Sequence, residues 1–182
     1  MQKRVLLLTG APGVGKTTVL TKTVDALKAK DVDIGGMISR EAQESSTRVG
    51  FEIIDLTNGK HGWLAHVNQK TGPQVGKYHV NIQDLDNVGV QAIREATEKC
   101  STIAIDEIGP MKLFSPKFKQ AVAQALESKK LVLAVEHARA KDPLINKAKQ
   151  RDDAEIFTIT LANRDAIADE LTKKVILNLK QN

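Results

Sequence analysis

Residues 10–17 read Gly10-Ala11-Pro12-Gly13-Val14-Gly15-Lys16-Thr17, which fills every position of the pattern G-x-x-x-x-G-K-[ST]. The preceding residues 4–9 form a short apolar run typical of a buried strand, and residues 18–30 carry apolar side chains at helical spacing. A strand, a glycine-rich loop and a helix in this order form an anion site, because backbone N–H groups turn inward and the helix N-terminus adds positive charge. An ordinary glycine-rich turn is the alternative, but it would not explain the complete pattern with both flanks. The stretch therefore predicts a loop that holds the phosphates of a nucleotide.

The last side chains of this loop have separate expected roles. Lys16 would reach the β- and γ-phosphates, and the hydroxyl of Thr17 would bind Mg²⁺. Thr18 follows directly, and we expect it to contact the nucleotide as well.

Length and composition indicate an ordinary globular chain. With 182 residues, of which 41% are hydrophobic, we expect a single domain spanning residues 1–182. No apolar run is long enough for a membrane span, and the run after the basic start Met1–Arg4 ends too early for a signal peptide. Cys100 is the one cysteine, so no internal disulfide can form, which is typical of a cytoplasmic protein.

The charge pattern does not favour nucleic acid as a partner. The formal net charge is +5, but the basic residues are scattered and aromatic residues make up 3% of the chain. A basic stripe or a stacking platform would be expected for nucleic-acid binding. We therefore expect a monomer that binds a nucleoside triphosphate, with nucleic acid as an unsupported possibility.

The middle of the chain predicts an antiparallel ribbon followed by a helix. Residues 33–39, 48–56 and 61–66 read as strands, and Asn58-Gly59 between the last two is a strong hairpin signal. Residues 82–99 then read as one helix with an apolar face.

The second half of the chain alternates strands with helices. Strands are expected at 102–107, 131–135 and 156–161, and helices are expected to start after Ser115, Asp142 and Asn163. The first two helix starts combine an N-cap with proline at the first helical position. Such alternation predicts an α/β fold with a mostly parallel sheet covered on both sides.

Two acids end the predicted strand at 102–107. Asp106 is the expected partner for Mg²⁺, bound directly or through water, because it follows a buried strand and the phosphate loop needs such a carboxylate. Glu107 is placed to orient or deprotonate an attacking water molecule. The alternative for Glu107 is an ordinary solvated acid of a loop.

The chain resembles the cancer-related nucleoside-triphosphatase family, also described as thermophile-type NTPases and once labelled nucleotide-kinase related. The resemblance implies a P-loop NTPase fold, a RecA-like three-layer sandwich, and Mg²⁺-dependent hydrolysis of ATP, GTP, CTP and UTP to the diphosphate. Lys112 departs from the family pattern, which implies an acid after Met111. The segments that carry the resemblance, in chain order, are 10–18, Gly35-Gly36, Arg48-Val49-Gly50-Phe51, 76–80, Asp106-Glu107-Ile108-Gly109-Pro110-Met111 and Asn163-Arg164.

Further cations are candidates for the γ-phosphate. Arg139 could act as an internal arginine finger and His137 could sense the γ-phosphate, because both follow the strand at 131–135; a basic surface loop is the alternative. Arg48 is a third candidate on the resemblance, although it could instead pair with Glu52.

Asn163 and Arg164 follow the last strand, where a nucleotide base could bind. Arg164 could stack on any base, which fits weak base selectivity. For Asn163 the alternative is a plain helix N-cap.

Two other functions remain open on the sequence. A nucleotide or nucleoside kinase would use a second substrate in place of water, but no arginine-rich lid is evident. A nucleotide switch or a nucleic-acid-coupled ATPase would serve a partner, but no Asn-Lys-x-Asp motif specifies guanine.

Overall fold

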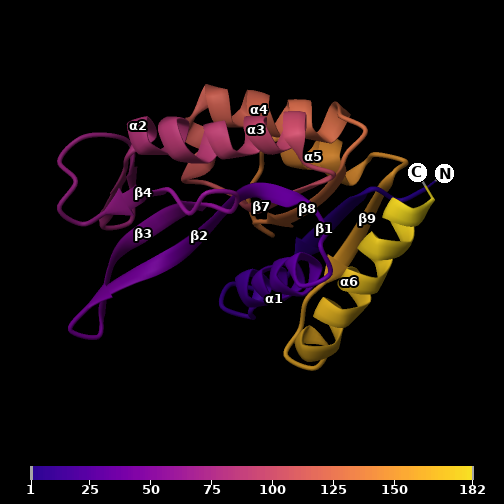
Figure 1. Cartoon of the computed structure of the whole chain (residues 1–182). Coiled ribbons are helices and arrows are strands. Elements are labelled where there is room, and N and C mark those ends of the chain that lie inside the picture. The colour runs from indigo at the N-terminus through magenta and orange to yellow at the C-terminus, as the bar shows by residue number, and fades with distance from the viewer. Residues whose placement is uncertain (1, 182) are drawn as a thin grey trace.

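The computed structural model describes residues 2–181 as three layers built around one sheet (Figure 1). The predicted span 1–182 includes Met1 and Asn182, which lie outside the described residues. Within residues 2–181 the sheet has nine strands. In spatial order they are β5 (Gln74–Val75), β6 (Tyr78–Val80), β4 (His61–His66), β3 (Thr47–Asp55), β2 (Ile34–Glu44), β7 (Thr102–Ile108), β8 (Leu131–Glu136), β1 (Val5–Thr9) and β9 (Ala154–Thr158).

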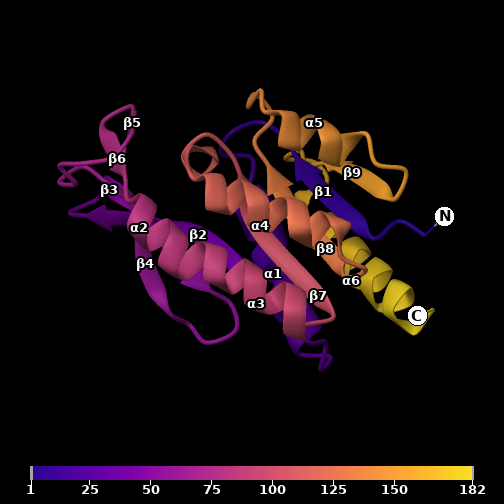
Figure 2. The same cartoon turned by 90° about the horizontal axis from the view of Figure 1, so that it is seen from above.

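Helices cover both faces of this sheet, as Figures 1 and 2 show. Helices α1 (Lys16–Lys28) and α6 (Arg164–Lys180) pack against one face. The other face carries α2 (Ile82–Asp84), a π-helical turn (Leu85–Val90), α3 (Gln91–Lys99), α4 (Pro116–Glu127) and α5 (Pro143–Lys149). The predicted α/β fold, with a mostly parallel sheet between helices and an antiparallel ribbon, is confirmed.

The central strands are apolar on both sides because both of their faces are covered. Successive side chains of a strand point to opposite faces. Val5 and Leu7 of β1 therefore join the core beneath α3 and α4, while Leu6 and Leu8 join the core beneath α1 and α6. All four side chains are fully buried. This double burial explains the uninterrupted apolar run, which is typical of parallel sheets.

The strand order places the phosphate loop near the acids of β7. Strand β8 pairs in parallel with β1 on one side and with β7 on the other. The carboxyl ends of these strands therefore meet at the same edge of the sheet, where ligands of open α/β sheets bind.

A long ribbon extends the sheet beyond this edge. The first residues of β2 pair in parallel with β7, and the strand then continues against the antiparallel β3 as far as Glu44. The turn at Asn58-Gly59 joins β3 to β4, with Gly59 in the left-handed region at φ 73°, so the predicted hairpin is confirmed.

Some predicted boundaries are wrong. The last strand spans 154–158 instead of 156–161. Ile159 is apolar and buried, as a strand residue would be, but it lies in the loop that follows the strand. The predicted helix 82–99 is interrupted by the π-helical turn, although its apolar face is buried as expected.

The helix caps agree with the sequence at two of three places. The side chains of Ser115 and Asp142 accept hydrogen bonds from the backbone N–H groups of Phe118 and Leu144. Asn163 does not cap α6 with its side chain. Instead its amide group stabilises the loop before the helix, by accepting from the backbone of residue 160 and donating to that of residue 158. No helix within residues 2–181 is long and apolar enough to cross a bilayer.

Candidate nucleotide-binding and hydrolytic site

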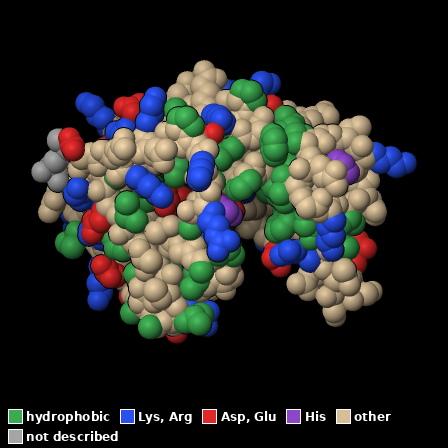
Figure 3. All heavy atoms as spheres, turned by 180° about the vertical axis from the view of Figure 1, so that it is seen from behind, with side chains coloured by type: hydrophobic (Ala, Val, Ile, Leu, Met, Phe, Trp, Pro, Cys, Tyr) green, Lys and Arg blue, Asp and Glu red, His purple; other side chains and the backbone are tan. Residues whose placement is uncertain are grey.

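The phosphate loop opens into a cavity of about 600 Å³ at the carboxyl edge of the sheet. The space-filling view shows a deep notch between the ribbon and the rest of the molecule (Figure 3). The loop after β1, the middle of β2, the end of β7 and the loop after β8 each contribute side chains to the cavity. Residues far apart in the sequence therefore face one space.

The phosphate loop takes the conformation that its glycines allow. Gly13 and Gly15 have φ angles of 74° and 106°, which other residues rarely adopt. Gly10, Pro12, Thr17 and Thr18 also line the cavity, as do Gly13, Gly15 and Lys16. Of the other predicted loop residues, Val14 is buried in the core beneath α1 and α6, and Ala11 is exposed.

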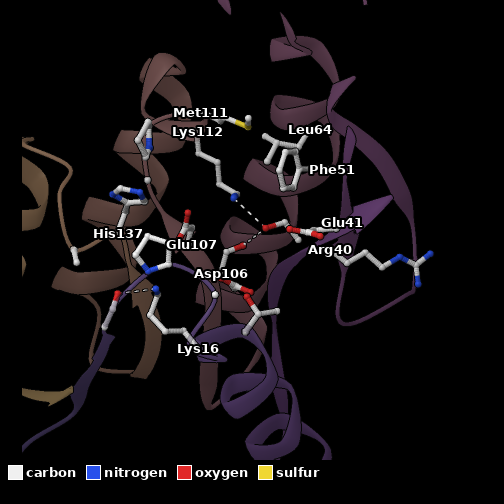
Figure 4. A pocket seen from close by; sticks show the side chains of 18 of the residues that line it. Lys16, Arg40, Glu41, Phe51, Leu64, Asp106, Glu107, Met111, Lys112 and His137 are labelled. Carbon is white, nitrogen blue, oxygen red and sulfur yellow. Dashed lines mark hydrogen bonds between the residues drawn. The ribbon is translucent and has the colours of Figure 1, made fainter. Parts of the chain in front are cut away.

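The ammonium group of Lys16 is held by two backbone carbonyl groups of the phosphate loop. Its Nζ donates hydrogen bonds to the carbonyl oxygens of Gly10 at 2.8 Å and Ala11 at 3.0 Å (Figure 4). Lys16 is also the first residue of α1, so the positive end of the helix dipole lies beside the ammonium group. Both features favour an anion in the loop.

Asp106 is buried at the end of β7, with 1% of its surface exposed. Burial raises the pKa of its carboxyl group to about 6; nearby Lys112 and a hydrogen bond with Thr17 act in the opposite direction. Among the described residues, its Oδ2 atom has no hydrogen-bond partner. A buried carboxylate oxygen without a partner, beside the Thr17 hydroxyl, fits a divalent cation.

The residues around Asp106 could supply only part of the coordination shell of a cation. No group of three or more His, Cys, Asp or Glu side chains is arranged to hold a metal anywhere in residues 2–181. Mg²⁺ commonly takes one or two protein oxygens and completes its shell with phosphate oxygens and water. The residues present therefore fit a cation that arrives with a nucleotide.

Glu107 is half-buried and lies between the loops after β7 and β8. A Cβ atom at Gly109 would lie 2.9 Å from its Oε1, so the glycine leaves the space that this carboxylate occupies. The backbone N–H of His137 donates to the carbonyl of Ile108 at 3.1 Å and ties the two loops together. The glutamate thus faces the cavity beside Asp106 and His137 (Figure 4).

The structure brings His137 and Arg139 to the cavity but leaves Arg139 exposed. Both line the cavity, and the Nδ1 atom of His137 accepts a hydrogen bond from the backbone N–H of Arg139 at 3.3 Å. Their position near the phosphate loop agrees with the sequence; the roles suggested for them remain predictions.

Arg164 and Asn163 are separated from this cavity. Arg164 lines a smaller hollow with Gly15, Thr18 and Lys22, and its Nη1 donates to the carbonyl of Val14 at 3.4 Å. Arg164 therefore remains a candidate for a base contact. Asn163 lines neither of these cavities, in keeping with the use of its amide in the preceding loop.

Arg48 lines the cavity, and the alternative that it pairs with Glu52 is wrong. Its guanidinium donates to Glu41 at 2.6 Å and to the hydroxyl of Tyr78 at 2.9 Å, and these two groups raise its pKa. Glu52 instead accepts from Arg40 at 2.6 Å. The pairing differs because Arg40, and not Arg48, lies opposite Glu52 in the β2–β3 register.

Sequence reasoning missed several residues of the cavity. Phe51, Leu64 and Met111 form an apolar wall opposite the phosphate loop (Figure 4), and Val75 lines the same cavity. Ser39 also lines the cavity, and its sequence signal is a polar residue at the end of the apolar run of residues 33–39. Lys112, which departs from the family pattern, lines the cavity as well.

Fold and site together define a P-loop nucleotide-binding protein in which a strand, β8, separates the phosphate-loop strand from the strand that carries the acids. A family model described as NTPase matches residues 5–172, and the chain belongs to this family. The predicted family is confirmed.

Relatives agree over almost the whole chain. It is 43% identical over 176 residues to a nucleoside-triphosphatase THEP1 of Thermofilum pendens, with 96% of this chain and 97% of the relative covered. A nucleoside-triphosphatase THEP1 of Methanosarcina acetivorans is also 43% identical, with 96% and 98% covered.

Solved structures share the fold. THEP1 from Aquifex aeolicus matches with a TM-score of 0.82 and 31% identity, over 94% of this chain and 98% of that one. A human cancer-related nucleoside triphosphatase matches with a TM-score of 0.81 and 32% identity, over 94% and 97%.

Proposed function

We propose that the chain hydrolyses nucleoside 5'-triphosphates to the diphosphate and phosphate, with Mg²⁺ and with broad tolerance of the base. The observation that carries the proposal is the position of Glu107 beside Asp106 in the cavity of the phosphate loop. Membership of the NTPase family supports the reaction class.

Each residue has a distinct task in this proposal. The loop N–H groups and Lys16 bind the β- and γ-phosphates, and Thr17 and Asp106 would hold Mg²⁺. When bound, the cation would neutralise negative charge on the phosphate oxygens. Glu107 orients the attacking water molecule or accepts its proton.

Broad base tolerance is proposed from the kind of side chain beside the loop. Arg164 is the side chain best placed for a base, and a guanidinium can stack on any aromatic ring. Such a contact does not distinguish one base from another.

Replacing Glu107 by Gln tests the proposal. The variant keeps size and polarity but cannot accept a proton, so hydrolysis should fall by a factor of about 10² to 10⁴. Nucleotide affinity, measured by calorimetry, should stay close to that of the unaltered protein. Glu98→Gln, on the exposed surface of α3, is the matched control and should hydrolyse at the normal rate. Normal turnover by Glu107→Gln would reject the role of Glu107.

The apolar wall gives one specific reason to test phosphoryl transfer as a second function. Phe51, Leu64 and Met111 offer a surface on which a second substrate could lie opposite the phosphate loop. Incubating ATP with nucleosides or nucleoside monophosphates should yield only the diphosphate and phosphate if the proposal holds. A newly phosphorylated product would establish a kinase.

A further inference from the structure

Lys112 is a buried lysine inside the nucleotide cavity. It lies in the short 3₁₀ turn Lys112–Phe114 that follows β7, and only 3% of its surface is exposed. Its Nζ donates to the hydroxyl of Ser39 at 3.2 Å, and this hydroxyl donates to the main-chain carbonyl of Asp106 at 3.0 Å. Figure 4 shows the side chain of Lys112 pointing into the cavity.

The ammonium group of Lys112 is incompletely paired. An ammonium has three N–H donors, and lysine is almost never fully buried without a partner. Ser39 is its one hydrogen-bond acceptor within residues 2–181, and no carboxylate in that range forms an ion pair with it. Burial lowers the pKa of Lys112, while the negative charges of Asp106 and Glu107 act in the opposite direction. Two donors are therefore left for something outside the protein.

The position of this ammonium limits what that partner can be. Lys112 lines the same cavity as Lys16, Thr17 and Glu107, and its side chain points into that cavity (Figure 4). Figure 4 shows Lys112 and Lys16 on opposite sides of the cavity. An anionic group with several oxygens between the two lysines would satisfy the remaining donors with charge-assisted hydrogen bonds.

We propose that Lys112 binds the terminal phosphoryl group of a bound nucleoside triphosphate, from the wall opposite Lys16. This inference rests on the proposed function, since it assumes a triphosphate in the cavity. Lys112 then recognises the third phosphate and adds positive charge where negative charge develops during hydrolysis. A nucleoside diphosphate lacks the group that this lysine contacts, so Lys112 distinguishes substrate from product.

The test compares ATP and ADP binding in Lys112→Met, measured by calorimetry in EDTA so that no hydrolysis occurs. Met keeps a long side chain but removes the charge. A hydrogen bond to a charged group corresponds to about a 10- to 100-fold change in affinity, so ATP should bind that much more weakly. The affinity for ADP should change by less than about twofold if the contact is to the third phosphate alone. Lys117→Met is the matched control, because that side chain is 65% exposed and outside the cavity; neither affinity should change.

A second variant controls for a loss of binding that is caused by misfolding of Lys112→Met. Lys112→Gln can still donate to Ser39 without a charge, and it should show the same selective loss for ATP. Equal losses for ATP and ADP, or no loss, in correctly folded variants would overturn the assignment. Failure of the proposed function has a different signature, because it would appear as absence of phosphate release from the unaltered protein with Mg²⁺.

Discussion

Replacing Ser39 by Ala should destabilise the nucleotide-free protein through two hydrogen bonds. The hydroxyl of Ser39 accepts from Lys112 at 3.2 Å and donates to the carbonyl of Asp106 at 3.0 Å. Each bond contributes about 1 kcal/mol, so the free energy of unfolding should fall by about 2 kcal/mol. For a chain of this length that corresponds to a decrease in Tm of roughly 4–8 °C.

A double-mutant cycle separates the two bonds. In a Lys112→Met background the bond from the ammonium is already absent, so Ser39→Ala should cost only about 1 kcal/mol. The coupling energy between the two positions is then also about 1 kcal/mol, within the range found for residues in one network. Lys112→Met alone should not lower stability, because replacing a poorly paired buried charge by an apolar group is often neutral or stabilising.

Urea unfolding of the four proteins, followed by circular dichroism, provides the measurement. Ser101→Ala serves as the control, because its hydroxyl donates to the carbonyl of Asp33 at 2.8 Å far from the cavity. Its cost should be the same in both backgrounds. Strictly additive effects of Ser39→Ala and Lys112→Met would refute the hydrogen-bonded chain.

Two further predictions concern the framework of the site. Gly36→Ala should lower the free energy of unfolding by about 3 kcal/mol or more in urea, because its Cβ would lie 2.0 Å from the carbonyl oxygen of Ala104 and its φ is 111°. Asp153→Asn should cost about 2 kcal/mol at pH 7, because it breaks ion pairs of 2.8 Å with Arg4 and Arg151. Burial alone would raise the pKa of Asp153, but these arginines lower it overall. The ionised carboxylate therefore stabilises the folded protein fully above about pH 4, and this stabilisation disappears as pH falls through the native pKa. Urea unfolding from pH 7 down to pH 3 should show the two proteins converging in acid.

Each of these predictions has its own check. Gly59→Ala also places alanine at positive φ, but its Cβ would meet nothing within 4 Å, so it measures backbone strain without the clash. An equal cost at Gly59 would show that the close approach of β2 to β7 contributes little. A constant difference between Asp153→Asn and the unaltered protein at every pH would exclude the ionised carboxylate as the cause.

The local half of the site could be predicted from sequence because its signals are contiguous. Residues 10–17 carry their strand and helix on either side, and Asp106 and Glu107 follow an apolar strand directly. The hairpin at Asn58-Gly59 is equally local, since the turn needs a residue that tolerates positive φ.

The remaining parts depend on contacts between distant segments. Arg48 pairs with Glu41 because the ribbon register places Arg48 opposite Gln43, two residues from Glu41 on β2, and no pattern within β3 specifies that register. Ile159 is apolar and buried, which is typical of a strand residue. A buried loop residue has the same apolar character, so the sequence does not distinguish the two. Lys112 could be noticed as unusual but not placed, because its burial results from the packing of the 3₁₀ turn beside Ser39.

The place of β1 between β8 and β9 has a consequence for biosynthesis. Strand β1 has neighbours that begin at residues 131 and 154, so more than a hundred further residues must be synthesised before it can pair. Pairing over such sequence distances is slow, because the chain must close large loops first. The phosphate loop, although it precedes these strands in the sequence, therefore gains its native shape late, and nascent chains without residues 131–158 should not bind nucleotide.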